Sequence, residues 1–308
     1  MRSDNGRLWS HGLVTAPTKI RFAASVPTNL ADPRPYVRLV EDLGFDSVWL
    51  SDLPMMAASD PVVALATLAE STERVHLGVN LVPFGRNPLV LARQLAQIDQ
   101  LSGGRLLITL VPGVDQPGER AALGTGRGDR GPLLEEYTDL LRRFWSGEAV
   151  THAGPAGSFA AARVEPRPVQ QPLELWFGGH GPKALDRVGR LGDGWLTAGI
   201  DPEAAGRARL AIEQAAAAHG RTVDPEHFGI SLPAARATVP ETTRAQMAAL
   251  YPGRRVEDLL PVGAEALRDH LARHVEAGLS KFVVRLVDPG DDGDDLRWLA
   301  DAVLPLQR

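Results

Sequence analysis

The stretch Leu43–Trp49, with the sequence LGFDSVW, joins the end of a predicted helix to the start of a predicted strand. Its pattern returns at Leu191–Leu196 (LGDGWL) and at Ala277–Phe282 (AGLSKF). In each copy a glycine stands just past the helix, where a left-handed residue ends helices, and a mostly apolar run follows. The repeat predicts a chain of alternating helices and strands.

Short runs that are apolar at nearly every position, rather than at every second one, are typical of strands buried on both faces of a parallel sheet. Eight such runs are present: Ile20–Val26, Phe45–Leu50, Val75–Val82, Leu106–Val111, Leu173–Phe177, Gly194–Leu196, Phe228–Leu232 and Lys281–Val287. The segments between most of them have helical period, and four of those begin with an N-cap residue before proline: Asp32, Asp60, Asn87 and Asp201. The pattern predicts an α/β fold, a (β/α)8 TIM barrel.

An open, doubly wound sheet is the alternative fold. Its dinucleotide fingerprint must directly follow a strand. Gly126–Gly131 matches that fingerprint by letters, but the residues before it are not strand-like, so a loop near the active site is the better interpretation.

Residues 1–18 form a polar segment, which we expect to be a flexible tail. Residues 19–308 are predicted to be a single barrel domain with two insertions. Residues 147–172, after the fourth βα unit, are rich in glycine and proline and predict a hairpin followed by an extended arm. Residues 238–262 predict a loop insertion after the seventh strand, of the kind that often forms lids or binding loops.

Composition excludes several classes of protein. The 308 residues carry 33 Lys and Arg against 38 Asp and Glu, a net charge of −5, which argues against a general nucleic-acid binder. The absence of cysteine removes disulfides, thiolate catalysis and cysteine–metal sites, and fits a reducing compartment. No apolar run reaches the length of about 18 residues that a membrane helix needs. We therefore expect a cytoplasmic protein without nucleic-acid or membrane partners.

In a TIM barrel the functional residues lie at the carboxyl ends of the strands. The turn Gly178–Gly181 follows a strand and precedes a helix that begins with proline, so its backbone N–H groups predict a phosphate site, with a plain tight turn as the alternative. Asp52 ends the second strand and could orient a cofactor, accept a proton or cap the next segment. Arg285, in the eighth apolar run, needs either an internal carboxylate or an anionic substrate as its partner. His270 and His274 could share a metal, but their spacing around an apolar stripe favours a structural role, and no metal site is predicted.

An ordered set of segments resembles the bacterial luciferase-like monooxygenase family, especially its branch that uses the deazaflavin coenzyme F-420. The resemblance covers about residues 20–305, and no single segment carries it. Its segments are Leu43–Trp49, Arg86–Pro88, Gln100–Arg105, Arg130 with Leu134–Tyr137, Trp145–Glu148, Phe177–Gly179 and Leu191–Trp195.

The resemblance implies roles for residues at the barrel mouth. Gly178, Gly179, His180 and Gly181 would hold the cofactor phosphate. Asn80-Leu81 aligns with a non-proline cis peptide that presses on the flavin ring, a bond that costs about 3–4 kcal/mol. Asp52 would lie beside the ring as the catalytic residue, and Pro112 and Gly113 would provide ring-facing backbone.

The chain departs from the family pattern at two positions. Leu53 follows Asp52 where many deazaflavin enzymes have histidine, and Val114 stands where some members have glutamate. These departures argue against sugar-phosphate or simple alcohol oxidation, while Met55 and Met56 favour an apolar substrate.

The resemblance therefore implies an oxidoreductase that transfers hydride between coenzyme F-420 and a small apolar organic molecule, and that forms a homodimer. One alternative is a monooxygenase that uses reduced FMN and oxygen, with a separate reductase. The other is a non-catalytic, flavin-binding barrel.

Overall fold

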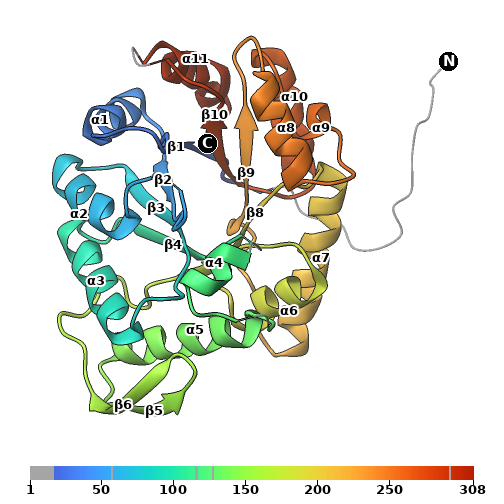
Figure 1. The fold of residues 1–308 in the computed structure, drawn as a ribbon. Coiled ribbons are helices and arrows are strands. Elements are labelled where there is room, and N and C mark those ends of the chain that lie inside the picture. Colours follow the sequence, from blue (N-terminus) through green and yellow to red (C-terminus); the bar gives the residue numbers. More distant parts are fainter. Residues whose placement is uncertain (1–16, 57, 115–116, 127, 291–292) are drawn as a thin grey trace.

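Eight parallel strands close into a barrel in the order β1-β10-β9-β8-β7-β4-β3-β2, so neighbours around the barrel are also neighbours in chain order (Figure 1). The computed structural model describes residues 17–56, 58–114, 117–126, 128–290 and 293–308. Residues 1–16 of the predicted tail lie outside this part. The barrel strands are β1 (Arg21–Ser25), β2 (Ser47–Ser51), β3 (His76–Leu81), β4 (Leu106–Leu110), β7 (Leu175–Phe177), β8 (Gly194–Ala198), β9 (Phe228–Ala234) and β10 (Lys281–Leu286). All eight predicted strands are confirmed, and with them the TIM barrel.

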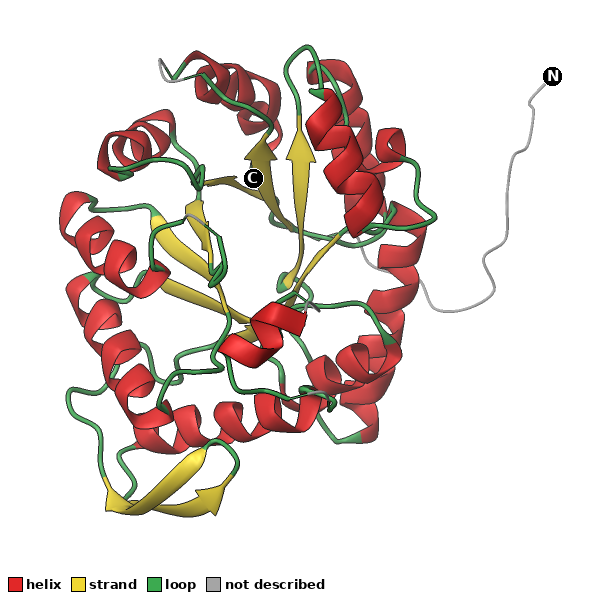
Figure 2. Cartoon of the chain, viewed as in Figure 1, coloured by secondary structure: helices red, strands yellow, loops and turns green. Residues whose placement is uncertain are grey.

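Most helices surround the barrel on the outside, whereas α4 lies in front of the strands near the centre of the view (Figure 2). The helices are α1 (Arg34–Leu43), α2 (Pro61–Ser71), α3 (Pro88–Leu101), α4 (Pro117–Ala122), α5 (Gly131–Ser146), α6 (Pro182–Leu191), α7 (Pro202–Ala218), α8 (Glu241–Leu250), α9 (Val256–Leu259), α10 (Ala264–Glu276), α11 (Asp294–Val303) and the 3-10 turn η1 (Leu304–Leu306). The main core lies between these helices and the outward faces of the strands, where Phe22 and Phe282 stack with ring centroids 5.5 Å apart.

Three of the four predicted N-caps are confirmed. The carboxylate of Asp60 accepts from the second and third N–H groups of α2, Asn87 does the same for α3, and Asp201 accepts from Ala204 in α7. Asp32 is different, because Pro33 occupies the cap position of α1. The Asp32 carboxylate still accepts from the backbone N–H of Arg34, the first residue of α1, at 3.0 Å, and it also pairs with the Arg34 guanidinium.

The three repeated joints do not share one backbone conformation. Gly44 and Gly278 are left-handed, with φ of 92° and 91°, as predicted. Gly192 instead has φ −77° and ψ 148°, so the prediction of a left-handed residue is wrong there. Glycine is needed at this joint for space, because a Cβ atom would lie 2.8 Å from the carbonyl oxygen of Val188.

Both insertions are present. Residues 147–172 contain the antiparallel hairpin β5 (Val150–Gly154) and β6 (Gly157–Ala162), which projects beyond α5, followed by the arm (Figure 1). Residues 238–262 are not the predicted loop, since they contain α8 and α9. Met247, Leu259 and Leu260 form with Ala235 a small apolar cluster of their own, which stabilises helical structure in this short segment.

Candidate functional site

The interior of the barrel is filled by one layer of large side chains. Trp49 and Trp176 lie there with Ala23, Leu196 and Val283, and Leu107 packs against them. Gly78 and Gly194 make room for the indoles, because a Cβ atom on Gly78 would lie 2.3 Å from the Trp49 ring and one on Gly194 would lie 2.4 Å from that of Trp176. Trp49 and Trp176 are 2% and 6% exposed, so the layer is tightly packed.

With the exception of Arg285, the inward positions nearer the carboxyl ends of the strands carry smaller side chains. Inward residues alternate along a strand, so the residues two positions beyond the tryptophan layer share the same face. These residues are Ser25, Ser51, Asn80, Thr109, Gly178, Ala198, Ser231 and Arg285. The change from indole rings to small groups leaves the barrel mouth as the end where a ligand can lie.

Asp52 lies at this mouth, directly after β2. Its side chain is only 4% exposed, and Oδ2 accepts from the backbone N–H of Val82 and from the guanidinium of Arg86, both at 3.2 Å. Arg86 also donates to Asp60 at 2.9 Å, so it bridges two carboxylates. Burial raises the pKa of Asp52, although Arg86 and the N–H group favour the charged form. Asp52 is therefore a partly desolvated acid with a fixed position.

Asn80 and Leu81 are residues of β3, and the expected cis bond between them is not present. Within the described residues, cis bonds precede only Pro166 and Pro172. The expectation is wrong because β3 pairs in regular parallel register with both of its neighbours up to Leu81, and regular pairing keeps the backbone extended. Asn80 still points inward, and its carbonyl oxygen accepts from the N–H of Asp52 at 2.8 Å.

Pro112 and Gly113 follow β4 and lie on a buried ion pair. Gly113 has φ 75°, and a Cβ atom there would lie 2.4 Å from Oε1 of Glu119. Glu119 faces Arg130 at 3.8 Å, and Arg130 donates to the carbonyl oxygens of Val114 and Gly113. This pair holds the loop after β4 against α4 and α5. Asp115, the next acidic residue, lies outside the described residues.

The turn Gly178–Gly181 links β7 to α6. Gly178 donates to Leu110 of β4 at 3.1 Å, and Gly179 has φ 94°. The carbonyl oxygen of Gly179 accepts from the Trp195 indole at 2.7 Å, which fixes the turn. Over the described residues, no acceptor faces the N–H groups of Gly179, His180 and Gly181. Consecutive N–H groups without an acceptor at a helix N-terminus are the kind of group that can bind an anion.

A groove of about 610 Å³ adjoins this turn. Its lining joins Pro112 and Gly181 to basic side chains: Arg120, Arg130, Lys183 and Arg187, with Asp129 as the one acid. Lys183 pairs with Asp129 at 2.8 Å and is 82% exposed, and Arg187 pairs with Glu135 at 3.1 Å. The groove therefore brings two of the predicted sites, the turn and the loop after β4, to one basic surface.

The helical insertion approaches the same turn from the other side. Arg254 pairs with the N-cap Asp201 and repels a protonated His180. Partial burial, with this repulsion as a smaller cause, lowers the pKa of His180. Tyr251 packs on the backbone of Gly199, just after β8, where a Cβ atom would overlap its ring.

Sequence reasoning missed Arg86, Trp195 and Tyr251. Arg86 stands in the segment Arg86–Pro88 that carries the resemblance, so that segment was the available signal. Trp195 was assigned to a strand, and its contact with the turn depends on the register of β7 with β8. Nothing in the sequence marks Tyr251, because its partner Gly199 is distant along the chain.

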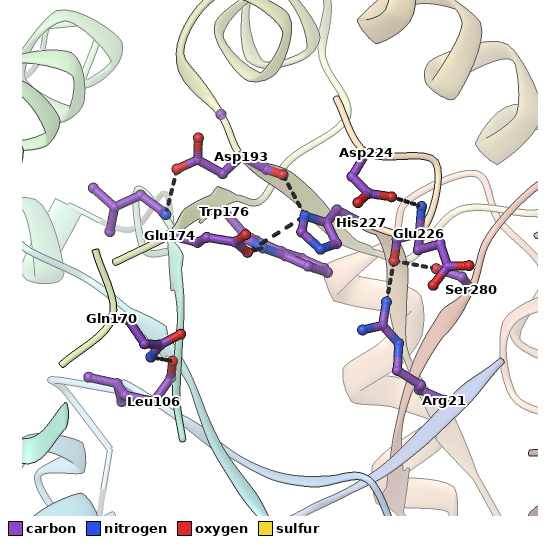
Figure 3. Close-up of polar contacts among 12 residues, drawn as sticks. Arg21, Leu106, Gln170, Glu174, Trp176, Asp193, Asp224, Glu226, His227 and Ser280 are labelled. Atoms are coloured by element: carbon purple, nitrogen blue, oxygen red, sulfur yellow. Dashed lines mark hydrogen bonds and ion pairs between the residues drawn. The ribbon is translucent and has the colours of Figure 1, made fainter. Parts of the chain in front are cut away.

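The opposite end of the barrel carries a second group of polar contacts, shown in Figure 3. His227 interacts through Nδ1 with the carbonyl oxygen of Asp193 at 2.9 Å, and its ring packs at a tilt of 36° against Trp176 with ring centroids 5.0 Å apart. Ser280 and Arg21 both donate to the carbonyl oxygen of Glu226. These contacts tie strand ends together, which is the structural role expected at this end of a TIM barrel.

His270 and His274 lie buried on α10, with ring centroids 4.7 Å apart. In the part of the chain that the structure describes, no three metal-ligating side chains come together. Across the same residues, no helix is both long and apolar enough to cross a bilayer.

A family model described as luciferase-like monooxygenase matches residues 11–286. The chain is 28% identical over 341 residues to an F-420-dependent glucose-6-phosphate dehydrogenase of Microbacterium testaceum, over 96% of this chain and 99% of that protein.

Solved structures with the same fold cover nearly the whole chain. An F-420-dependent secondary alcohol dehydrogenase, in complex with an F-420–acetone adduct, has a TM-score of 0.77 at 18% identity, over 94% of this chain and 100% of that one. The coenzyme F-420-dependent tetrahydromethanopterin reductase of Methanopyrus kandleri has a TM-score of 0.76, with the same identity and coverage. A monooxygenase from Streptomyces bottropensis has a TM-score of 0.76 at 19% identity, over 93% of this chain and 99% of that one.

Proposed function

The chain belongs to the luciferase-like monooxygenase family, and on that premise we propose that it is an oxidoreductase that transfers hydride between coenzyme F-420 and a small organic substrate. The observation that carries the proposal is the row of free N–H groups at Gly179, His180 and Gly181, at the barrel end where small side chains replace the tryptophan layer. Residues with these properties fit a cofactor that has a planar ring and a phosphate.

The turn would hold the phosphate, and the ring would lie over the inward layer between Asn80 and Gly178. When bound, the deazaflavin supplies the carbon that accepts or donates hydride. Pro112 and Gly113 bound the same space from the loop after β4. The basic groove continues from the turn and would attract further negative charge on the cofactor.

Asp52 is the proposed catalytic residue. Its raised pKa and its position at the mouth suit a group that holds a proton beside the ring. The hydrogen bonds found for Asp52 among the described residues, from Val82 and Arg86, all reach Oδ2, so Oδ1 would be the atom that exchanges a proton. Leu53, in the place of the family histidine, provides no proton, so Asp52 carries this role alone.

FMN is the second candidate cofactor, because the same turn accepts any phosphate monoester and a monooxygenase shares the fold. Full-length similarity to an F-420-dependent enzyme favours the deazaflavin. We also propose a homodimer, supported by the exposed Val63 and Val90 on the neighbouring helices α2 and α3. A cytoplasmic location is proposed separately, because a chain without cysteine fits a reducing compartment. A separate reductase is proposed only with FMN.

A paired fluorescence titration with coenzyme F-420 and FMN tests the proposal. We expect micromolar binding of F-420 and weaker binding of FMN. Gly179→Ala should weaken cofactor binding about tenfold, because φ 94° costs an alanine about 1–2 kcal/mol. Gly44→Ala is the matched control, since it imposes the same left-handed strain at φ 92° away from the barrel mouth, and nothing lies within 4 Å of the added methyl group.

The outcomes separate the candidates. Preference for FMN, with oxygen uptake that depends on reduced FMN, would identify a monooxygenase. Cofactor binding without turnover of any acceptor would indicate a non-catalytic barrel. Equal losses in the two glycine variants would show that the phosphate does not lie on this turn.

A further inference from the structure

Arg285 is the one charged residue in the inward layer at the barrel mouth. It follows Val283 of the tryptophan layer by two positions on β10, so it shares the inward face one step nearer the carboxyl end. The other seven inward positions carry a serine, alanine, glycine, threonine or asparagine. A guanidinium therefore stands among small neutral groups.

No carboxylate neutralises this cation. Within the described residues, the guanidinium of Arg285 has no ion pair and no hydrogen bond, unlike Arg86, Arg130 and Arg187 at the same end of the barrel. Solvent reaches it from the mouth, while the surrounding protein desolvates it and lowers its pKa. Arg285 is therefore a solvent-accessible cation at the barrel mouth with no counter-charge from the described protein, an arrangement that suits an anionic ligand.

Tyr251 provides a second donor beside Arg285. It interacts electrostatically with the guanidinium, and its ring rests on Gly199 at the end of β8. Its hydroxyl has no hydrogen-bond partner among the described residues. The hydroxyl group and the guanidinium are therefore two unused donors that come from different elements to the same side of the mouth.

We infer that Arg285 and Tyr251 bind the carboxylate of the organic substrate, an inference that rests on the proposed function of this barrel mouth. A guanidinium matches a carboxylate in shape, through two parallel hydrogen bonds. Its single positive charge balances a monoanion, whereas a phosphate would need a second cation. Arg254, on the same helical insertion as Tyr251, is already paired with Asp201. Met55 and Met56, exposed on the loop after β2 at the same mouth, suit an apolar body for that substrate.

The cofactor phosphate is assigned to a different place, three strands away around the barrel on the turn after β7. Arg285 is therefore a specificity-determining residue for the substrate, and its loss should leave cofactor affinity unchanged.

Binding of benzoate to the cofactor-free chain, followed by calorimetry, tests the inference without turnover. Arg285→Gln should lower benzoate affinity at least tenfold, and Tyr251→Phe should lower it less. The matched control is Arg236→Gln, because Arg236 is exposed and paired with Asp295, and it should bind benzoate like the unmodified chain. Arg285→Gln should unfold at the same temperature or a higher one, which excludes misfolding as the cause.

Labelling with phenylglyoxal and peptide mass spectrometry gives an independent readout. Benzoate should slow the labelling of Arg285 and not that of Arg236, and inorganic phosphate at the same concentration should protect Arg285 less. Absent protection by benzoate, or stronger protection by phosphate, would overturn the inference. So would a loss of cofactor affinity in Arg285→Gln equal to its loss of benzoate affinity, because Arg285 would then contact the cofactor. Failure of the unmodified chain to bind F-420 and FMN would instead overturn the proposed function.

Discussion

Arg86 donates to both Asp52 and Asp60, and its removal should destabilise the folded chain. Arg86→Met removes the cation and keeps most of the side-chain volume. Removal of one partner of a buried ion pair costs about 3–5 kcal/mol, and we expect the lower end of this range because Arg86 is 24% exposed. The pair with Asp60, which is 44% exposed, accounts for less than about 1 kcal/mol of this loss.

The loss should depend on pH. Asp52 has a raised pKa in the folded chain, so neutral Asp52 favours folding below its unfolded value of 3.8, and this contribution is lost as pH rises through the folded pKa. Arg86→Met raises that pKa further. The variant should therefore lose about 3 kcal/mol at pH 8 and less than about 1 kcal/mol near pH 4, where Asp52 is largely protonated in both folded proteins.

Urea unfolding at both pH values measures these free energies, and a double-mutant cycle with Asp52→Asn isolates the pair. In the Asp52→Asn background, Arg86→Met should cost less than about 1 kcal/mol at either pH, because no buried charge remains. Equal losses at pH 4 and pH 8, or additive effects in the cycle, would show that Arg86 does not stabilise a desolvated carboxylate.

Two further predictions concern buried groups away from the mouth. Burial lowers the pKa of His270 to about 4, so its neutral form stabilises the fold above pH 6.5, and about 3 kcal/mol of this should be lost as pH falls from 6.5 to 4. His270→Leu, beside Leu267 and Leu271, should flatten this part of the stability profile in urea titrations, and an unchanged slope would contradict the assignment. Lys281→Met should cost about 3 kcal/mol, because it leaves the Asp46 carboxylate without its buried partner. Thermal unfolding should show that Lys281→Met combined with Asp46→Asn regains most of this stability. If the double variant is no more stable than Lys281→Met, Lys281 does not stabilise the fold through its pair with Asp46.

The fold was predictable because the burial of each strand and helix determines which positions in the sequence are apolar. Strands such as Leu106–Leu110 are covered on both faces, so the apolar run is continuous and its length marks the strand. The helices α8 and α9 were missed since Pro240 and the exposed polar residues of this segment resemble a loop. Their helical structure depends on contacts of Met247 and Leu259 with Ala235, which no local pattern records.

Site residues were predictable where they directly follow a strand. They were less predictable where their role depends on contacts with residues far away in the sequence. Asp52 and Gly178–Gly181 follow strands, and the barrel topology alone brings them to one end. The partner of Asp52 stands 34 positions away at Arg86, and the lack of a partner for Arg285 is a property of the folded arrangement. The expected cis bond after Asn80 came from the resemblance, and the regular register of β3 does not support it.

The tryptophan layer has a consequence for the order of events during turnover. Trp49 and Trp176 fill the barrel interior, so a cofactor and a substrate must both enter and leave through the barrel mouth. Whichever molecule sits deeper has to arrive first and depart last. If the ring rests directly above the indoles, binding follows a compulsory sequence, and an excess of substrate traps the cofactor inside. Steady-state rates would then fall at high substrate concentration. This substrate inhibition would be imposed by two side chains that take no part in the chemical step.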